Sequence, residues 1–487
     1  MTEQPKTEAQ ALDDRRAKLE RLRAEGIDPF PHAYPGAVAI ESVHGAHGEL
    51  EAGQETEATY RVAGRLSARR GQGKAAFLDV VARSGRIQVH ARVDVLGPKE
   101  FERLLSLDLG DLVGIDGTAF KSRRGELSLR ADGWTLLAKS LRPPPDKYHG
   151  LQDVETRYRQ RELDLIANED SRRLFLLRSQ VVSRIRRHLD DRGFLEVETP
   201  VLQPLYGGAM ARPFVTHHNA LDRDLYLRIA TELYLKRLIV GGLERVYELG
   251  KDFRNEGISH KHNPEFTMLE WYEAYGDYET GAERLEELVT DVVGASGAPG
   301  EGIDWQRPWA RLKLRDAVLD ATGVDVSAAE DTETLVAAAK ERGIELDPTE
   351  SWPQLVDELL SKHVEPKLMN PTFVMDYPVA LSPLAKRHRS EDGLVERWEC
   401  FAGGIEIANA FSELNDPDDQ RARFEEQQRL GAEGDEETQP YDEDYVRALE
   451  HGMPPTSGVG LGIDRLVMLL AGRTTLREVI LFPAMRN

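Results

Sequence analysis

The sequence predicts an α+β protein, with a small β-barrel near the N-terminus and a larger domain built on an antiparallel sheet flanked by helices. Two observations predict this arrangement. Short alternating strands crowd residues 57–140, and two long aromatic strand patterns, 245–253 and 265–275, flank a polar loop. The chain of 487 residues, 40% hydrophobic and 30% charged, is long enough for two or three domains with a large core.

The composition also restricts the cellular compartment. No apolar run approaches the ~20 residues that a transmembrane helix needs, and residues 1–26 are charged throughout, unlike a secretory signal. Cys400 is the only cysteine, which excludes intramolecular disulfides and cysteine-rich zinc sites. We therefore expect a cytoplasmic protein without a membrane segment.

Residues 1–56 are expected to form a helical extension, because 7–26 have a charged helical pattern that Gly26 stops. Residues 57–147 predict a five-stranded barrel of the OB type, which often binds single-stranded nucleic acid. Its strands are expected at 59–66, 75–81, 86–93, 112–120 and 126–139, with a helical interruption at 99–106.

The barrel segment is basic although the chain is acidic. Residues 60–147 contain 17 Lys and Arg against 10 Asp and Glu, whereas the whole chain has a net charge of −22. A basic module on an acidic body suggests contact with phosphates, but an uneven surface without function fits the charges equally. Phe77, beside Arg70 and Lys74, is the ring that we would choose for stacking a base; by pattern alone it would be a core residue.

The proline-rich segment 142–147 is predicted to be a stiff linker, and residues 148–487 to form the second domain. There, a long helical pattern at 171–192 precedes a strand that ends at Pro200. Residues 280–370 are acidic and helical without a chemical motif. We expect them to be an insertion that covers the site.

The two aromatic strand patterns predict an antiparallel hairpin with an unusual face. Because side chains alternate along a strand, Arg254 and Glu256 share a face on one arm, and Phe266, Glu270 and Tyr272 share a face on the other. Burying these charges is costly unless they are paired or meet a ligand. A solvated face with surface ion pairs would explain the charges, whereas the interleaved rings favour the floor of a binding site.

This hairpin resembles motif 2 of the class II aminoacyl-tRNA synthetases, in which Arg-x-Glu ends one strand and a Phe lies on the next. Its runs FRNEG, HNPEFT and EWYEAY are similar to the lysyl-tRNA synthetase form. The helix–strand–Pro unit ending at Pro200 resembles motif 1, the dimer-forming element, and GVGLGIDR with Arg465 resembles motif 3. The motifs occur in order over nearly the whole chain. The resemblance therefore implies a class II catalytic domain and a homodimer.

The resemblance implies ATP-dependent activation of L-lysine to lysyl-adenylate and its transfer to the 3′ end of tRNA(Lys). No protein nucleophile is required, so catalysis is expected to consist of positioning and charge stabilisation. Arg254 and Arg465 then correspond to the catalytic residues. The positions that match the family's ATP site are Arg254, Glu256, Lys261, His262, Phe266 and Arg465.

The same resemblance implies an acidic pocket for the amino acid. Glu232 would hold the α-ammonium group, while Glu270 and Glu413, with the Tyr272 hydroxyl, would surround the ε-ammonium group. The expected lysine site comprises Gly208, Glu232, Arg254, Glu270, Tyr272, Asn409, Phe411 and Glu413.

Two further sites follow from the resemblance. Glu399 and Glu406 would hold Mg²⁺ beside the phosphates. Glu406 falls on the opposite strand parity from Asn409, so both glutamates reach one site only through a bulge or a bent strand. In the barrel, a phenylalanine would stack an anticodon base and three polar side chains would read its uridines; the matching positions are Phe77, Arg70, Gln88 and Glu126.

Three alternatives stay open at this stage. A synthetase paralogue that lysylates a protein or a lipid would tend to lack the barrel or to carry a membrane segment. A non-catalytic OB-fold RNA-binding scaffold would be expected to have lost motif residues. An aspartyl or asparaginyl enzyme of the same subclass would need a cation or amide reader where Glu270 and Glu413 stand.

The pocket assignment generates a prediction. Glu413→Gln removes a charge that pairs with the ε-ammonium group, so it should raise the KM for lysine far more than the KM for ATP. Steady-state pyrophosphate exchange measures both constants. Equal effects on the two substrates would refute the ammonium role.

Overall fold

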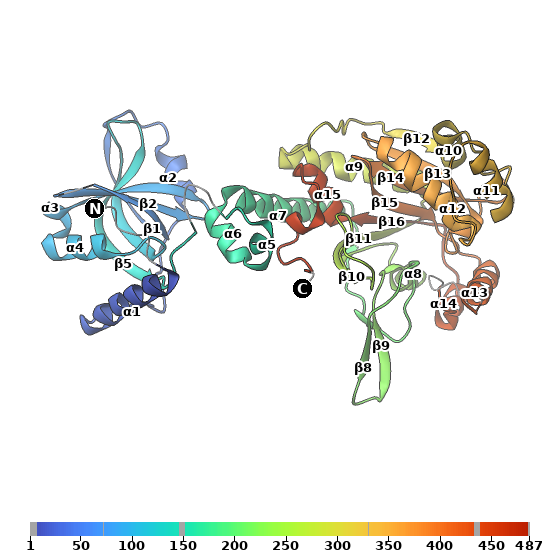
Figure 1. Ribbon diagram of the computed structural model, residues 1–487, viewed down its shortest axis with the longest axis horizontal. Coiled ribbons are helices and arrows are strands. Elements are labelled where there is room, and N and C mark those ends of the chain that lie inside the picture. Colours follow the sequence, from blue (N-terminus) through green and yellow to red (C-terminus); the bar gives the residue numbers. More distant parts are fainter. Residues whose placement is uncertain (1–6, 72, 146–150, 330, 433–438, 486–487) are drawn as a thin grey trace. The chain divides into compact units, whose positions relative to one another are not determined.

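The computed structural model in Figure 1 describes residues 7–71, 73–145, 151–329, 331–432 and 439–485. The chain divides into two compact units, Met1–Arg172 and Arg173–Asn487. One unit holds a closed five-stranded barrel and the other an eight-stranded sheet with helices, which confirms the predicted α+β class. The end of the predicted linker 142–147, residues 146 and 147, lies outside the described residues.

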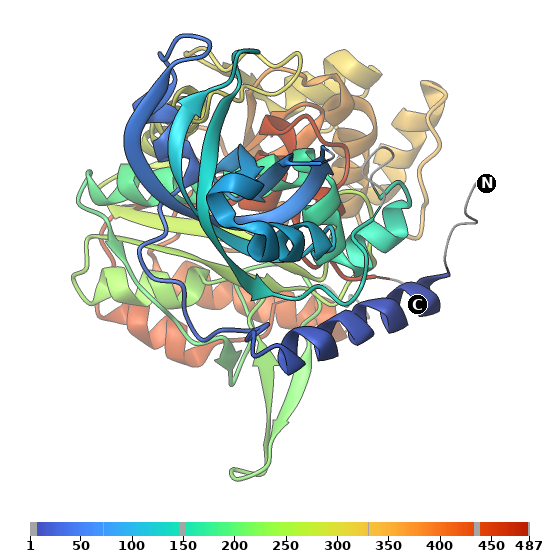
Figure 2. The same ribbon diagram turned by 90° about the vertical axis from the view of Figure 1, so that its left-hand side faces the viewer.

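The barrel strands follow the order β1-β2-β3-β5-β4, which closes the sheet on itself (Figure 2). Alternate apolar side chains, such as Val62, Leu78 and Val89, fill its interior. The strands and helices are β1 (Glu55–Arg70), β2 (Ala75–Ala82), β3 (Gly85–Arg92), α3 (Val93–Leu96), α4 (Pro98–Ser106), β4 (Leu112–Lys121) and β5 (Leu127–Ala138). The five predicted strands and the helical interruption are confirmed.

The N-terminal helix α1 (Glu8–Ala24) packs on this barrel. The Arg15 guanidinium donates hydrogen bonds to the carbonyl oxygens of Leu109 and Ser140, each over 3.0 Å. Leu19 and Leu22 are buried on the same helix. A second helix, α2 (Ile40–His47), precedes β1.

The second unit is organised around a sheet with the order β12-β13-β14-β15-β16-β11-β10-β6. Its inner pairings are antiparallel, and the two outermost, β12–β13 and β10–β6, are parallel. The strands are β6 (Leu195–Glu196), β10 (Arg245–Phe253), β11 (Glu265–Ala274), β12 (Ala310–Lys313), β13 (Thr372–Pro378), β14 (Leu394–Ala402), β15 (Ile405–Ser412) and β16 (Thr456–Gly462).

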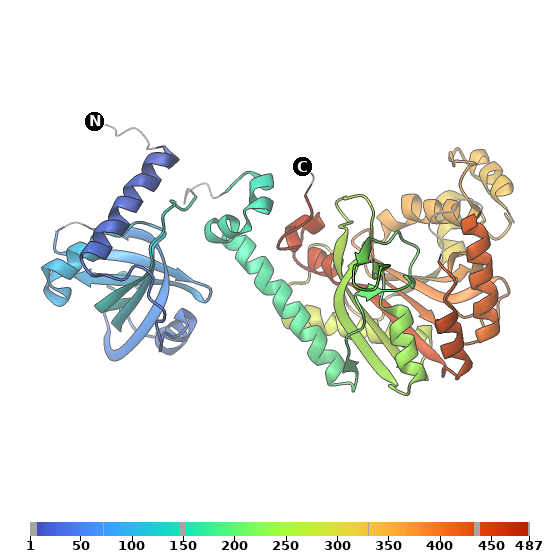
Figure 3. The ribbon, with the colours of Figure 1, turned by 90° about the horizontal axis from the view of Figure 1, so that it is seen from below.

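One face of this sheet is covered by three helices, α7 (Glu169–Asp190), α9 (Tyr278–Ser296) and α15 (Ile463–Leu470) (Figure 3). Alternate strand residues such as Leu269 and Trp271 are buried against them. The intervening residues Glu270 and Tyr272 point to the other face, where they line a cavity. The predicted hairpin is β10–β11, with Arg245 opposite Glu273 and Phe253 opposite Glu265.

The strand bulge required for the two glutamates is present between β14 and β15. Cys400 pairs with Ala408, whereas the next residue, Phe401, pairs with Glu406, so Ile407 is the extra residue. The bulge reverses the parity of Glu406. As a result Glu399 and Glu406 line the same cavity.

The helical segment expected at about 280–370 contains two different parts. Its first helix, α9, belongs to the main core. Residues 314–364 form an apolar cluster of their own against β13 and β14. This second part consists of α10 (Leu314–Thr322), α11 (Thr332–Glu341), α12 (Trp352–Leu359) and a π-helical turn, Leu360–Val364, and is followed by the 3₁₀ turn Glu365–Lys367.

The remaining elements complete the two units. A small sheet, with the order β7-β9-β8, carries the hairpin that points away from the main sheet in Figure 1. These elements are α5 (Val154–Arg159), α6 (Arg161–Ala167), β7 (Leu202–Gln203), β8 (Val215–His218), β9 (Arg223–Leu227), α8 (Glu232–Val240), the 3₁₀ turn Val379–Leu381, α13 (Pro417–Ala432), α14 (Glu443–Glu450) and α16 (Leu476–Val479).

Candidate active site

A cavity of about 540 Å³ lies on the polar face of the large sheet. Its floor is formed by β11, β14, β15 and β16, and its walls by the loop after β10, the start of α8 and part of α12. The structure brings together in this cavity all the residues of the second unit that the sequence predicts for the site: Gly208, Glu232, Arg254, Glu256, Lys261, His262, Phe266, Glu270, Tyr272, Glu399, Glu406, Asn409, Phe411, Glu413 and Arg465.

The hairpin positions the first of these residues. Arg254 follows β10 directly, and its backbone N–H donates to the carbonyl of Pro264, 2.9 Å away, which closes the loop. Its guanidinium carbon lies 5.1 Å from the centroid of the Phe266 ring. The motif therefore presents a cation and an aromatic ring on one surface of the cavity.

Arginine–glutamate pairs dominate one end of the cavity. Arg465, in the first turn of α15, donates through Nη1 to the Glu406 carboxylate and to the Glu406 carbonyl, both over 2.8 Å. Burial alone would raise the pKa of Glu406, but Arg465 holds that pKa below its usual range. The Glu406 carboxylate is thus already ionised and paired.

Glu399 has two partners that the sequence motifs do not include. The Arg397 guanidinium lies 2.5 Å from one oxygen of Glu399, and the Tyr377 hydroxyl donates to the other over 2.9 Å. Burial, reinforced by the nearby Glu406, raises the pKa of Glu399 to about 7 despite Arg397. Arg397 also donates to Asn409 over 3.1 Å and lies 5.6 Å from the Phe411 ring centroid. It therefore links the two ends of the cavity.

The loop between the hairpin arms contributes Lys261 and His262. The Lys261 ammonium is 2.8 Å from the carboxylate of Glu365, which follows the π-helical turn. Burial lowers the pKa of His262 to about 4, and the neighbouring Arg465 and Lys261 lower it in the same direction. His262 is therefore a neutral imidazole at physiological pH, and its Nδ1 lies 2.9 Å from the Ser259 hydroxyl.

Buried carboxylates dominate the other end of the cavity. Glu232, Glu270 and Glu413 are all at least nine-tenths buried. Glu270 accepts hydrogen bonds from the Thr231 backbone N–H over 3.1 Å and from the Tyr272 hydroxyl over 3.2 Å. The Lys236 ammonium contacts both Glu232 and Glu413.

This acidic end lacks enough positive charge to ionise all of its carboxylates. Burial raises the pKa of Glu270 to about 8, and the negative Asp252 and Glu232 act in the same direction. Burial also raises the pKa of Glu413 to about 8, although Lys236 opposes the shift. Three carboxylates facing one ammonium group leave room for additional positive charge from a ligand.

A glycine on β16 shapes this end of the cavity. A Cβ atom at Gly458 would lie 1.9 Å from Oε1 of Glu413 and 2.4 Å from Cε1 of Tyr272. Both side chains therefore pack against bare backbone. The glycine-rich run of motif 3 thus makes space for the pocket as well as leading into α15.

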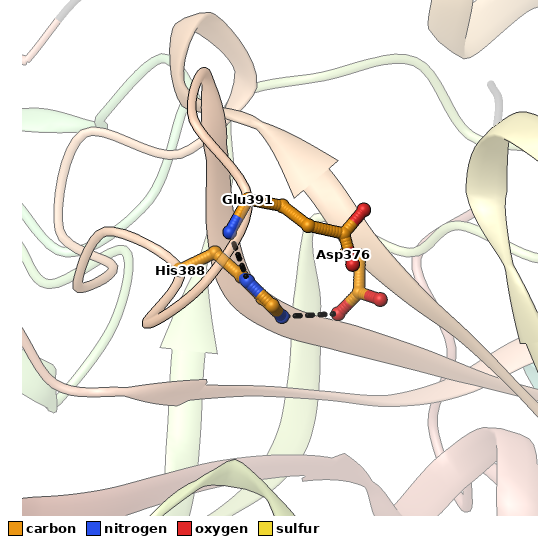
Figure 4. Close-up of side chains that lie close together, drawn as sticks. All are labelled: Asp376, His388 and Glu391. Carbon is orange, nitrogen blue, oxygen red and sulfur yellow. Dashed lines mark hydrogen bonds and ion pairs between the residues drawn. The ribbon is translucent and has the colours of Figure 1, made fainter.

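The donors expected for a metal suit a hard cation. Glu399 and Glu406 place carboxylate oxygens at the same end of the cavity, and oxygen donors are what Mg²⁺ prefers. A second group with metal-type side chains, Asp376, His388 and Glu391, lies elsewhere (Figure 4). Nδ1 of His388 accepts the Glu391 backbone N–H over 3.0 Å, and Nε2 faces Asp376 at 3.6 Å.

That second group is an ion-pair network. The ammonium group of Lys313 contacts Glu391 and lies 3.8 Å from Asp376. A metal there would face this ammonium group and the Nε2–H that points at Asp376. The cavity carboxylates fit a metal better.

The predicted anticodon residues lie on one outer surface of the barrel. Phe77 is half-buried and stacks on His90, with ring centroids 4.6 Å apart and an interplanar angle of 9°. It is not part of the apolar core of the barrel, unlike its neighbours Ala76 and Leu78. The amide of Gln88 donates to Glu126 over 2.9 Å.

Arg70 pairs with Asp79 over 2.9 Å on this same surface. The register aligns Phe77 with Arg70 on one side and with His90 on the other. The structure therefore groups an aromatic ring, a cation and polar side chains, as stacking and reading of bases require.

The sequence motifs missed three side chains that matter to these sites: Arg397, Lys236 and His90. An ion pair between Lys236 and Glu232 could have been predicted, because Lys236 lies four residues after Glu232 on a predicted helix. His90 shares strand parity with Gln88, so it could have been placed on the same surface. Arg397 shares strand parity with Glu399, so it could have been placed on the same face in the same way.

Comparison with known proteins identifies the same two domains and the same family. Residues 153–486 match the family model of class II tRNA synthetases (D, K and N), and residues 60–137 match that of the OB-fold nucleic acid binding domain. The chain is 50% identical to the lysine–tRNA ligase of Carboxydothermus hydrogenoformans and 51% to that of Dehalococcoides mccartyi, over 96% of each chain. It is 49% identical to the lysine–tRNA ligase of Staphylococcus aureus, over 97% of this chain and 98% of the relative.

The raised pKa values predict proton release when the acidic end binds L-lysine, the ligand expected from the sequence. Ammonium groups favour ionised Glu270 and Glu413, whose pKa values near 8 keep them mostly protonated at pH 6.5. Affinity should therefore rise from pH 6.5 to 7.5, by up to about tenfold for each group that ionises.

Isothermal titration calorimetry in buffers of different ionisation enthalpy would measure both affinity and proton release. Glu413→Gln is the matched control and should release fewer protons. A pH-independent affinity without proton release would contradict this account of the pocket.

Proposed function

The chain belongs to the class II tRNA synthetases of the aspartyl, lysyl and asparaginyl group, and from this membership we propose that it is a lysine–tRNA ligase. It uses ATP to activate L-lysine and transfers the lysyl group to the 3′ end of tRNA(Lys). The observation that carries the choice of lysine is the acidic end of the cavity, where Glu232, Glu270 and Glu413 are buried with one ammonium group.

The first step joins lysine to ATP. A carboxylate oxygen of lysine attacks the α-phosphorus of ATP, the bond to the β-phosphate oxygen breaks, and lysyl-adenylate and pyrophosphate form. Arg254 lines the cavity beside Phe266, and it would neutralise the lysine carboxylate and the α-phosphate as charge develops. The chain supplies positioning and charge.

In the second step a hydroxyl of the terminal ribose of tRNA attacks the carbonyl carbon of the adenylate. The bond to the phosphate oxygen breaks, and AMP leaves. The adenylate provides the leaving group, so the step needs no protein nucleophile.

The arginine-rich end of the cavity is proposed to bind the nucleotide. Phe266 and the Arg465 guanidinium would hold adenine between them, and Glu256 would accept a hydrogen bond from its amino group. Lys261 and His262 lie on the loop that would meet the outer phosphates. Lys261 would have to exchange Glu365 for a phosphate oxygen.

Glu399 and Glu406 are proposed to hold Mg²⁺, which would supply charge neutralisation for the triphosphate. Both carboxylates face the cavity, and both are paired with arginines, Arg397 and Arg465. The arginines keep these carboxylates oriented towards the nucleotide.

The acidic end explains why lysine is preferred to aspartate or asparagine. Two carboxylates in excess over Lys236 match the two ammonium groups of lysine. The side-chain carboxylate of aspartate would meet like charge there, and the neutral amide of asparagine would leave a buried carboxylate unpaired. Asn409 is proposed to orient the α-carboxylate and Phe411 to pack on the aliphatic stem.

A homodimer is proposed on the motif 1 region. Leu195 on β6 and Leu202 on β7, two short strands that follow the motif 1 helix α7, are 51% and 49% exposed, and a second copy of the chain would cover them.

A cytoplasmic location is proposed because the family acts in translation. In the described part of the chain, no helix is long and apolar enough to cross a membrane.

The test of this function is ATP–pyrophosphate exchange with each of the twenty amino acids, followed by charging of unfractionated tRNA. Exchange with lysine alone and formation of lysyl-tRNA are expected. Exchange with lysine but no charging of tRNA would indicate a paralogue with another acceptor. No exchange with any amino acid would leave the RNA-binding scaffold as the function.

The barrel surface generates a separate prediction. Phe77→Ala should lower the kcat/KM for tRNA charging about ten- to a hundredfold, because stacking one base contributes ~1–3 kcal/mol. Lysine-dependent pyrophosphate exchange should stay unchanged, because it needs no tRNA. Phe30→Ala, at an exposed phenylalanine of the same unit, is the control. Equal charging by both variants would show that Phe77 does not contact the tRNA.

A further inference from the structure

Lys236 is a buried cation in the acidic end of the cavity that no motif of the sequence contains. It lies one turn after Glu232 on α8, and its side chain is 0% exposed. Its Nζ is 2.5 Å from Oε1 of Glu232 and also contacts Oε2 of Glu413. The Tyr445 ring on α14 lies beside it, with its centroid 6.0 Å from Nζ.

The two carboxylates that Lys236 joins come from distant parts of the chain. Glu232 begins α8, whereas Glu413 follows β15 directly. Two buried carboxylates in such proximity repel each other, and one of them would take up a proton if no cation stood between them. The ammonium group of Lys236 therefore sets the separation of the two carboxylates as well as their charge.

The second oxygen of each carboxylate lies beside a glycine of the cavity wall. Oε2 of Glu232 is 3.7 Å from the position of a Cβ at Gly208, and Oε1 of Glu413 is 1.9 Å from that of a Cβ at Gly458. Both glycines line the cavity. Lys236 thus contacts one oxygen of each carboxylate, and the other oxygen lies against a glycine of the cavity wall.

We propose that Lys236 is a positioning residue for the amino-acid substrate, which orients the Glu232 and Glu413 carboxylates and offsets their mutual repulsion, so that they can receive the two ammonium groups of lysine. This inference rests on the proposed function, because it assigns both carboxylates to the substrate. Lys236 itself does not touch the substrate and acts through its two partners.

The charges around Glu413 make the effect dependent on pH. Glu232 on α8 and Glu270 on β11 face it with negative charge, Tyr272 and Tyr445 face it with hydroxyl groups, and Lys236 supplies the positive charge. Burial raises the pKa of Glu413, and Lys236 opposes that shift. Removing the ammonium group should raise this pKa further, so that lysine binds well only at higher pH.

The variant Lys236→Met keeps an unbranched side chain of similar size and removes its charge. We expect the affinity for L-lysine to fall about tenfold or more at pH 7, because one unit of pKa corresponds to a tenfold change. The loss should shrink as the pH is raised from 6.5 to 8.5. The affinity for ATP should change by less than about threefold, since Lys236 lies at the other end of the cavity. Calorimetry with L-lysine and with ATP measures these quantities.

A double-mutant cycle separates positioning from a general structural role. In the Glu413→Gln background, Lys236→Met should cost less, because one of the two partners of Lys236 is already neutral. The double variant also leaves no unpaired charge between these two residues, so it tests the inference even where Lys236→Met alone does not fold. Lys251→Met, at a lysine of β10 whose side chain is 39% exposed, is the matched control and should bind lysine normally.

Three results would overturn the inference: unchanged lysine affinity in Lys236→Met, a loss of equal size at every pH, or an equal loss in both backgrounds. Failure of the proposed function is a separate result. If the unmodified protein activates no lysine in pyrophosphate exchange, the function is wrong. If it activates lysine and Lys236→Met binds lysine normally, only the role of Lys236 is wrong.

Discussion

The opposite chemistry of the two faces of the large sheet is the constraint on which the site depends. Along β11, Leu269 and Trp271 pack into the helical layer, while Glu270 and Tyr272 enter the cavity. A buried carboxylate is tolerated only where its surroundings are fixed and its partners are in place. The dense apolar packing beneath the sheet supplies that rigidity, so the charged floor depends on the core below it.

The two ends of the cavity balance charge in different ways. At the end proposed to bind the nucleotide, Arg397 pairs with Glu399 and Arg465 pairs with Glu406. At the acidic end, proposed to bind the amino acid, carboxylates outnumber the ammonium group that contacts them. In the proposed function, the first arrangement orients carboxylates and cations towards phosphates, and the second leaves negative charge that the two ammonium groups of a ligand would neutralise. The proposed selectivity for lysine thus rests on a shortage of positive charge.

Much of this organisation could be predicted from the sequence, because it follows from local periodicity. The alternation of apolar and polar residues, with turn residues between the runs, predicted the strand Arg245–Phe253 and the five barrel strands. The polarity of Glu270 on a strand otherwise rich in aromatic residues indicated a binding surface. These features depend on residues close together in the chain.

What escaped prediction depends on contacts between distant segments. The contact of Arg397 with Asn409 exists only because β14 lies beside β15. Helix α9 packs in the main core because it crosses several strands of the large sheet. The periodicity of a helix does not reveal the order of the strands that it crosses. Lys236 likewise has a partner that local spacing does not reveal, because Glu413 lies 177 positions away.

In the proposed function, the side chain of Lys236 lies near the place where lysine is activated, which raises a problem of self-acylation. An acyl-adenylate reacts with free amines, and the enzyme carries one in its own pocket. Glu232 and Glu413 raise the pKa of Lys236 above its usual range and outweigh the effect of burial. The nitrogen is therefore held as an ammonium ion, which has no lone pair with which to attack. The ion pairs that shape the pocket thus also protect it from its own product.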